Sequence, residues 1–147
     1  MNNTNEVAVI NELLEEQTKA VRTKNVTEAI KNYAPDVTVF DVVGPLQHPE
    51  GSASVAHRLE QWFSTFDPKK DLNLEQIELV TIADDNLAFS HSLNHVQASL
   101  ANGGSLDMYW RETLNWQKTD GTWKIRHTHS SVPFDPATGM ASTQLKP

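Results

Sequence analysis

The chain has 147 residues, of which 38% are hydrophobic and 21% are charged, a composition that suits one globular domain with one core. The formal net charge is −7 and lysine and arginine form no stripe, so nucleic acid is not expected as a partner. The absence of cysteine excludes disulfides and thiolate sites. Because the sequence shows neither a signal peptide nor an apolar run of membrane-spanning length, we expect a cytoplasmic protein with no membrane partner.

The first part of the chain has the apolar spacing of helices. A helix is predicted from about Thr4 to Thr23, and Gln17 falls on its apolar stripe. The apolar members of that stripe are Val7, Ile10, Leu13, Leu14 and Val21. A short second helix follows, capped by Asn25 or Thr27, and ends before Pro35.

A strand, a loop and a third helix come next. The strand is "VTVFDVV" (37–43), and the loop "GPLQHPEG" (44–51) is rich in turn residues. Ser52 or Ser54 can cap the third helix. Its apolar stripe consists of Val55, Leu59, Trp62, Phe63 and Phe66. Trp62 and Phe63, with Phe40 and Tyr33, suit the core and also the wall of an apolar pocket.

The remaining chain alternates like sheet. The alternating stretches are "LNLEQIELVTIA", "NLAFSHSLNHVQASL", "LDMYWRETLNWQK" and "TWKIRHTHSSV". Asp120–Gly121 between the last two is a strong hairpin signal. Helices followed by a long meander predict an α+β fold with a curved antiparallel sheet around the helices.

Several stretches resemble the SnoaL-like and ketosteroid-isomerase-like proteins of the nuclear transport factor 2-like superfamily. They are "YAPDVTVFDVVG" (33–44), Gly51 with Trp62 and Phe63, "RETLNWQKTDGTWKI" (111–125) and "HTHSSVPFD" (127–135). The resemblance implies a cystatin-like cone, a curved and largely antiparallel (mixed) sheet wrapped around two to three N-terminal helices. It also implies a pocket inside the cone and a homodimer. We expect one SnoaL-like domain over 1–147, with the cone at about 4–134 and a polar tail at 135–147.

Asp41 ends a strand before a Val-Gly turn, as the general base does in ketosteroid isomerases. The resemblance implies that role, and the alternative is an acid that caps the turn. Gln17 and Thr113 align near the positions of that enzyme's two acidic hydrogen-bond donors, so we expect no true steroid isomerase activity. Gln17 is still expected in the pocket, because a polar residue on a buried stripe needs a partner or a ligand.

The register of the last hairpin decides which side chains face the cone. If Lys118 pairs with Thr122, then Arg111 faces His129 inside the cone, and Trp110, Leu114 and Trp116 point outward. We prefer this register, because it gathers polar groups inside and leaves an aromatic outer face for a partner sheet. A slip of one residue inverts the faces and places Glu112 opposite His129.

His127 and His129 share one face of a strand and have three interpretations. They can bind a metal, with His91, His95, Asp41 or Glu112 as a third ligand, although nothing in the sequence selects one. They can work as acid–base or hydrogen-bonding groups in the pocket. They can also be structural at the edge of the cone. We expect no bound metal and no cofactor.

Arg111 suits a carboxylate or enolate oxygen, and its alternative is a surface salt bridge. The predicted catalytic residues are therefore Asp41, His129 and Arg111, with His129 and Arg111 in one polar cluster near Asp41. The predicted ligand-binding residues are Gln17, Tyr33, Phe40, Trp62, Phe63, His91, His95, Tyr109 and His127.

Two classes of function follow from these residues. The first is an enzyme resembling ketosteroid isomerases or polyketide cyclases, which moves a proton on a small, partly apolar carbonyl or carboxylate compound. The second is a non-catalytic ligand-binding or dimerisation module resembling the calcium/calmodulin-dependent kinase association domain. A homodimer is expected to pack through Trp110, Leu114 and Trp116.

Overall fold

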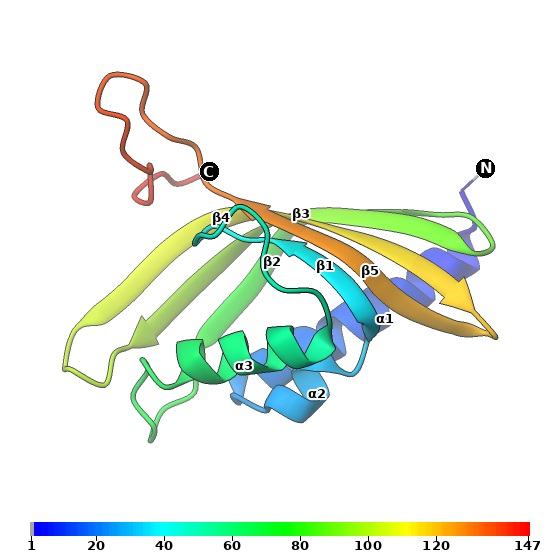
Figure 1. Cartoon of the computed structure of the whole chain (residues 1–147), viewed down its shortest axis with the longest axis horizontal. Helices are drawn as coiled ribbons and strands as arrows, with labels where there is room; N and C mark the ends of the chain where they lie inside the picture. The colour runs from blue at the N-terminus through cyan, green and yellow to red at the C-terminus, as the bar shows by residue number, and fades with distance from the viewer. Residues whose placement is uncertain (1) are drawn as a thin grey trace.

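The computed structural model describes residues 2–147, which form one curved sheet with three helices on its concave side (Figure 1). The helices are α1 (Thr4–Arg22), α2 (Val26–Ile30) and α3 (Ser52–Phe63). The strands are β1 (Tyr33–Phe40), β2 (Asn73–Ala83), β3 (Leu87–Ser99), β4 (Ser105–Thr119) and β5 (Thr122–Ser131).

The sheet has the strand order β1-β5-β4-β3-β2. β1 runs parallel to β5 and every other neighbouring pair is antiparallel, so the sheet is mixed. The predicted α+β fold, a curved mixed sheet around N-terminal helices, is confirmed.

The helix starts show how local sequence sets the fold. The Asn3 side chain accepts hydrogen bonds from the first turn of α1, and Asn25 caps α2 as predicted. The predicted serine cap of α3 is wrong, because Gly51 holds that position without a side-chain bond. Its φ is +105°, and a Cβ there would lie 2.9 Å from the Pro35 carbonyl oxygen, so this close approach of loop to strand requires glycine.

The core consists of two clusters at the two ends of the cone. One joins α1 to the ends of β4 and β5 through buried side chains such as Ile10, Leu14 and Trp116. The other packs the end of α3 on the start of β2 and the end of β3 through Phe63, Leu74 and Val96. Apolar side chains that face inward from both layers thus close the cone at each end and leave its middle to other residues.

The last hairpin differs by one residue from the preferred register. Asp120 and Gly121 form the loop with φ angles of 50° and 76°, the positive values that a two-residue hairpin turn needs. Lys118 consequently pairs with Trp123 and not with Thr122. This slip inverts the predicted faces of β4.

β5 also contains a bulge that the alternating pattern conceals. Trp116 of β4 pairs with Ile125. The residue before it, Asn115, pairs with His127, so Arg126 is an extra residue in β5. A bulge of this kind shifts the alternation of side chains by one position.

The bulge explains why two histidines follow a buried stretch of strand. Before it, Ile125 is fully buried against the helices. After it, Thr128 and Ser130 point into the cone, whereas His127 and His129 lie on the outer face. The strand therefore places no imidazole in the core.

The outer face of the sheet is not the predicted one. Trp116 is 1% exposed and Leu114 is 2% exposed, and Trp110 lines the cavity, so the row expected to form a dimer faces inward. The outer face instead carries polar side chains, histidines and several exposed apolar side chains. The exposed apolar ones on the sheet are Phe40, Val80, Ile82, Leu87 and Phe89.

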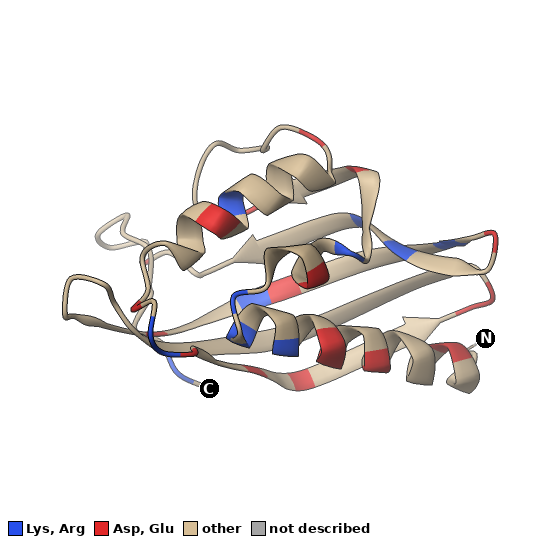
Figure 2. Cartoon of the chain, turned by 90° about the horizontal axis from the view of Figure 1, so that it is seen from below, with Lys and Arg blue, Asp and Glu red and all other residues tan. Residues whose placement is uncertain are grey.

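The segment after β5 extends away from the sheet and folds on itself through a bridge between Phe134 and Ala141 (Figure 1). Lysine and arginine are scattered over the side seen in Figure 2 and form no stripe. Within residues 2–147, no helix is long and apolar enough to cross a membrane.

Candidate functional site

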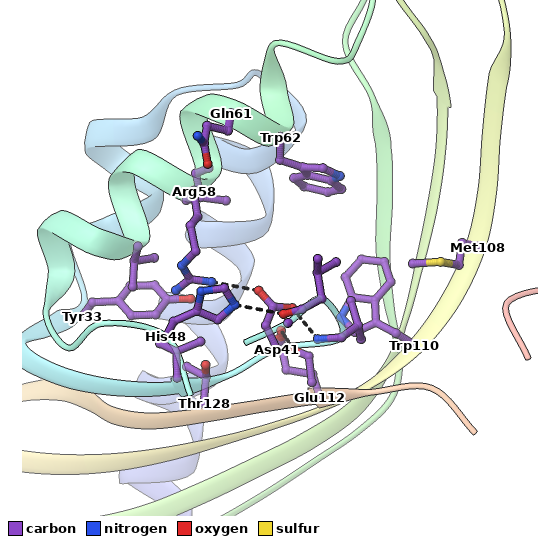
Figure 3. A pocket seen from close by; sticks show the side chains of 17 residues that line it. Tyr33, Asp41, His48, Arg58, Gln61, Trp62, Met108, Trp110, Glu112 and Thr128 are labelled. Carbon is purple, nitrogen blue, oxygen red and sulfur yellow. Dashed lines mark hydrogen bonds and ion pairs between the residues drawn. The ribbon is translucent and has the colours of Figure 1, made fainter. Parts of the chain in front are cut away.

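A cavity of about 410 Å³ opens between the concave sheet and α3 (Figure 3). Its apolar wall consists of Val39, Val42, Val43, Val55, Leu59, Trp62, Met108 and Trp110. Its polar groups come from Tyr33, Asp41, His48, Arg58, Gln61, Glu112, Thr128 and Ser130. A mainly apolar wall with a few polar groups is typical of small-molecule sites.

Asp41 lies at the mouth, directly after β1. One carboxylate oxygen is 2.8 Å from Arg58 Nη1 on α3, and the other accepts the Val42 backbone N–H at 2.7 Å. Both oxygens are thus engaged, and Arg58 balances the charge of Asp41 (Figure 3). The His48 ring donates to the Val43 carbonyl at 3.0 Å and helps to hold the loop that forms the mouth.

Glu112 reaches the cavity from the middle of β4, on the face that the register turns inward. Burial raises the pKa of its carboxyl, and the nearby charge of Asp41 adds to this effect. Hydrogen bonds from Asn94, Ser130 and Trp110 oppose it. Glu112 is therefore a carboxyl that is enclosed by protein except where it meets the cavity, with its titration moved upward.

Tyr33 begins β1 and faces the same space as Glu112. The Gln17 amide donates to its hydroxyl oxygen at 3.3 Å, which leaves the phenolic proton free to point into the cavity. Burial raises the pKa of Tyr33, and the charge of Glu112 raises it further. The hydroxyl thus stays protonated and can donate a hydrogen bond to a ligand oxygen.

The structure places some of the predicted site residues at the cavity. Asp41, Tyr33 and Trp62 line it, and Gln17 lies behind Tyr33. Phe63, which was expected in the pocket wall, is buried in the core cluster under α3.

The prediction that Arg111 and His129 face the cone near Asp41 is wrong. The hairpin slip and the bulge in β5 turn both to the outer face, where Thr113 pairs with His129 and Ser131 with Arg111. The cavity wall contains neither residue.

The other predicted ligand-binding residues of the strands also lie on the outer face. Phe40 packs edge-on against His127, whose Nδ1 is 2.7 Å from the Thr38 hydroxyl. His95 stacks on Tyr109 at 3.9 Å. Its Nε2 bonds the Asp107 carboxylate at 2.7 Å and lowers the pKa of that acid.

His91 stacks on Phe89 on this same outer face, so all four strand histidines lie outside the cavity. No three histidine, aspartate or glutamate side chains gather as a metal site anywhere in residues 2–147.

Most of the polar cavity residues were missed from the sequence, and Arg58 and Glu112 are the two that carry charge. Arg58 lies on α3 between apolar positions, and no local sequence pattern shows that its side chain pairs with Asp41. Glu112 was named as the residue that a slip in register would move to the other face. The two-residue Asp-Gly loop was the signal that could have selected this register.

Residues 10–135 match the family of SnoaL-like domains, and the chain belongs to that family. The recognised family and superfamily are thereby confirmed. No protein of curated function matches the sequence.

Solved structures share the fold over all or most of the chain. An NTF2-like protein of unknown function from Pseudomonas putida KT2440 is 28% identical, with a TM-score of 0.88 and 100% of each chain covered. A candidate calcium/calmodulin-dependent protein kinase II association domain from Xanthomonas campestris is 21% identical, with a TM-score of 0.70, and 89% of this chain and 88% of that one are covered. A candidate scytalone dehydratase from Novosphingobium aromaticivorans is 14% identical, with a TM-score of 0.75 and coverages of 87% and 84%.

Proposed function

We propose that this chain is an acid–base enzyme that binds a small, largely apolar carbonyl compound in the cone and moves a proton at the carbon next to the carbonyl. The observation that carries this proposal is the enclosed Glu112 carboxyl, with its raised pKa, facing an apolar cavity beside the Tyr33 hydroxyl. A carboxylate in such surroundings is a stronger base than one in water, as proton abstraction from carbon requires.

Charge in the cavity favours a neutral carbonyl compound over a carboxylate. Arg58 is already paired with Asp41, and Glu112 is a second acid. A ligand carboxylate would therefore meet two acids and no uncommitted arginine or lysine among the described lining residues. A ketone or aldehyde oxygen would need one donor, which Tyr33 supplies.

The proton transfer then has a simple course. Tyr33 donates a hydrogen bond to the carbonyl oxygen, and the Glu112 carboxylate takes the proton from the adjacent carbon. The electrons of the broken C–H bond form a C=C bond, and the charge moves to the oxygen that Tyr33 holds. Where the enolate is conjugated to a further C=C bond, return of the proton from Glu112 to the distant carbon completes an isomerisation. Where the carbon next to the deprotonated one bears a hydroxyl, its C–O bond breaks and the oxygen takes the proton from Glu112 and leaves as water, which completes a dehydration, the activity named for one candidate neighbour.

Hydrogen exchange of a ketone tests this proposal without knowledge of the natural substrate. We expect the protein to accelerate exchange of the α-hydrogens of 2-tetralone in D₂O, followed by proton NMR. Tyr33→Phe should slow the catalysed exchange about 100-fold, the usual cost of one donor to a developing oxyanion. Tyr109→Phe, on the outer face, is the matched control and should leave the rate unchanged.

A non-catalytic ligand-binding or assembly module is the alternative. It is favoured by the similarity in fold to a candidate kinase association domain and by the engagement of both Asp41 oxygens. Binding of 2-tetralone, seen as a thermal shift, with no accelerated exchange would contradict the enzyme proposal and support this one.

We also propose that two chains pair through the outer face of the sheet, as a cytoplasmic homodimer. The support is now the exposed apolar group on β2 and β3, where Ile82 pairs with Phe89 and both point outward. A patch of this kind is costly to leave in water.

Sedimentation velocity at micromolar concentration is expected to show a dimer. Phe89→Lys should give a monomer, because a lysine would lie in the middle of the apolar patch. Leu46→Lys, on the fully exposed mouth loop, is the control and should stay dimeric. A monomeric wild-type protein under these conditions would contradict the pairing.

A further inference from the structure

A second, smaller cavity continues the first one toward α1. Its volume is about 110 Å³. It shares with the larger cavity the residues Tyr33, Leu59, Trp62, Trp110 and Glu112. The two spaces are therefore neighbours, and Tyr33 and Glu112 belong to the wall that they share.

Polar side chains line the inner cavity, which lies between α1 and the sheet. Gln17 and Thr18 enter it from α1, Gln76 from β2 and Asn94 from β3, between apolar residues such as Leu14. None of these four is charged. Neutral polar groups at this depth indicate a space that receives hydrogen-bonding groups and not a continuation of the apolar core.

One polar atom of the Gln17 amide has no hydrogen-bond partner among the described residues. One atom of its amide contacts the Tyr33 hydroxyl at 3.3 Å, and the other is buried with no hydrogen-bond partner among the described residues. With the amide nitrogen on Tyr33, the unpaired atom is Oε1, a hydrogen-bond acceptor. A group that paired with the free end would remove the cost of burying it unsatisfied.

Gln76 faces the same space from β2 and contacts the Thr18 hydroxyl. The Thr18 hydroxyl lies 2.8 Å from the Leu14 carbonyl oxygen and 3.3 Å from Gln76 Oε1. A hydroxyl has one proton, so Thr18 cannot make a full hydrogen bond to both acceptors. Asn94, by contrast, accepts from Ser92 at 2.9 Å and bonds Glu112, so it is satisfied.

We propose that the inner cavity is a subsite for a hydroxyl group of the ligand, and that the ligand is therefore a hydroxy ketone or hydroxy aldehyde. This inference rests on the proposed function, which places the carbonyl oxygen on Tyr33. A hydroxyl donates its one proton to the unpaired Gln17 Oε1 and keeps its oxygen as an acceptor for the Gln76 amide N–H. Because Tyr33 and the free end of the Gln17 amide are neighbours, the hydroxyl belongs on a carbon one or two bonds from the carbonyl carbon.

The test compares two ketones that differ by one group. In 2-hydroxyacetophenone a hydroxyl occupies the position of the terminal methyl group of propiophenone, so the two have nearly the same shape. Their dissociation constants are measured by quenching of tryptophan fluorescence, since Trp62 and Trp110 line the cavity. We expect the hydroxy ketone to bind about tenfold more tightly, the difference made by one satisfied buried group.

Gln17→Leu should remove that preference, so that the two ketones bind with about the same affinity. Leucine continues the apolar stripe of α1 and is expected to fold, and Gln76→Leu provides a second variant with the same expected loss of preference. Gln117→Leu, on the exposed outer face of β4, is the matched control and should keep the tenfold ratio.

Each outcome separates the hydroxyl subsite from the proposed function. Equal binding of both ketones by the wild-type protein would overturn the subsite and leave the carbonyl site standing. A preference that survives in both Gln17→Leu and Gln76→Leu would also overturn it, and would leave water as the occupant of the inner cavity. Failure of both ketones to bind would overturn the subsite together with the carbonyl site.

Discussion

Glu112→Gln is expected to slow catalysed exchange of ketone α-hydrogens by about 100- to 10,000-fold, the range for loss of a positioned acid–base group. Glutamine keeps the shape of the side chain and its contacts with Asn94 and Ser130, but it cannot take a proton. The same change is expected to stabilise the fold at neutral pH, raising Tm by a few degrees.

The gain in stability follows from the titration of Glu112. Burial raises its pKa in the folded chain, so the folded state holds this proton more firmly than the unfolded state does. The resulting stabilisation is fully present below the ordinary pKa of glutamate and is lost as the pH rises through the raised value. Above that value the wild-type protein carries an ionised, enclosed carboxylate, which is costly to bury. The Glu112→Gln variant carries a neutral amide there and avoids this cost.

Thermal unfolding between pH 3 and 8 checks this expectation. The two proteins should unfold at similar temperatures at the acid end, and the variant should be the more stable one at neutral pH. Glu75→Gln, an exposed glutamate on β2, is the matched control and should change neither Tm nor exchange. Lower stability of Glu112→Gln at pH 7, or exchange at the wild-type rate, would contradict the role given to Glu112.

Much of the fold could be predicted from short-range patterns. The helical spacing of Ile10 and Leu14, the Asn25 cap and the position of the Asp120–Gly121 turn each depend on a few neighbouring residues. Each of these appears in the structure as expected, although the pairing around the turn differs by one residue. The resemblance of four stretches to SnoaL-like proteins extended these local features to a whole cone, which the family match confirms.

The candidate site was harder to predict, because it depends on which face each strand turns inward. A single extra residue at Arg126 reverses the alternation of β5, and alternation alone cannot show it, since polar side chains continue on both sides of the bulge. The preferred register placed the imidazoles and Arg111 inside the cone. Packing requires the other face of β4 to turn inward, because Trp116 contributes much more apolar area to the core than Asn115 would.

Trp116→Ala is accordingly expected to destabilise the fold by about 3 to 5 kcal/mol, the usual cost of removing a buried tryptophan. Trp116 is 1% exposed in the cluster that joins α1 to β4 and β5, and its indole N–H donates to the Ser90 hydroxyl at 3.2 Å. Truncation leaves a cavity and also removes the partner of a buried hydroxyl.

The neighbouring residue provides a control that separates the two registers. Asn115 points to the exposed outer face, so Asn115→Ala should change the free energy of unfolding by about 0.5 kcal/mol or less. In the inverted register Asn115 would lie in the core and Trp116 on the surface, and the order of the two effects would reverse. Urea denaturation of both variants measures that order directly. A larger loss for Asn115→Ala than for Trp116→Ala would return Arg111 and His129 to the cone and remove Glu112 from it, because one register fixes the faces of all these residues together.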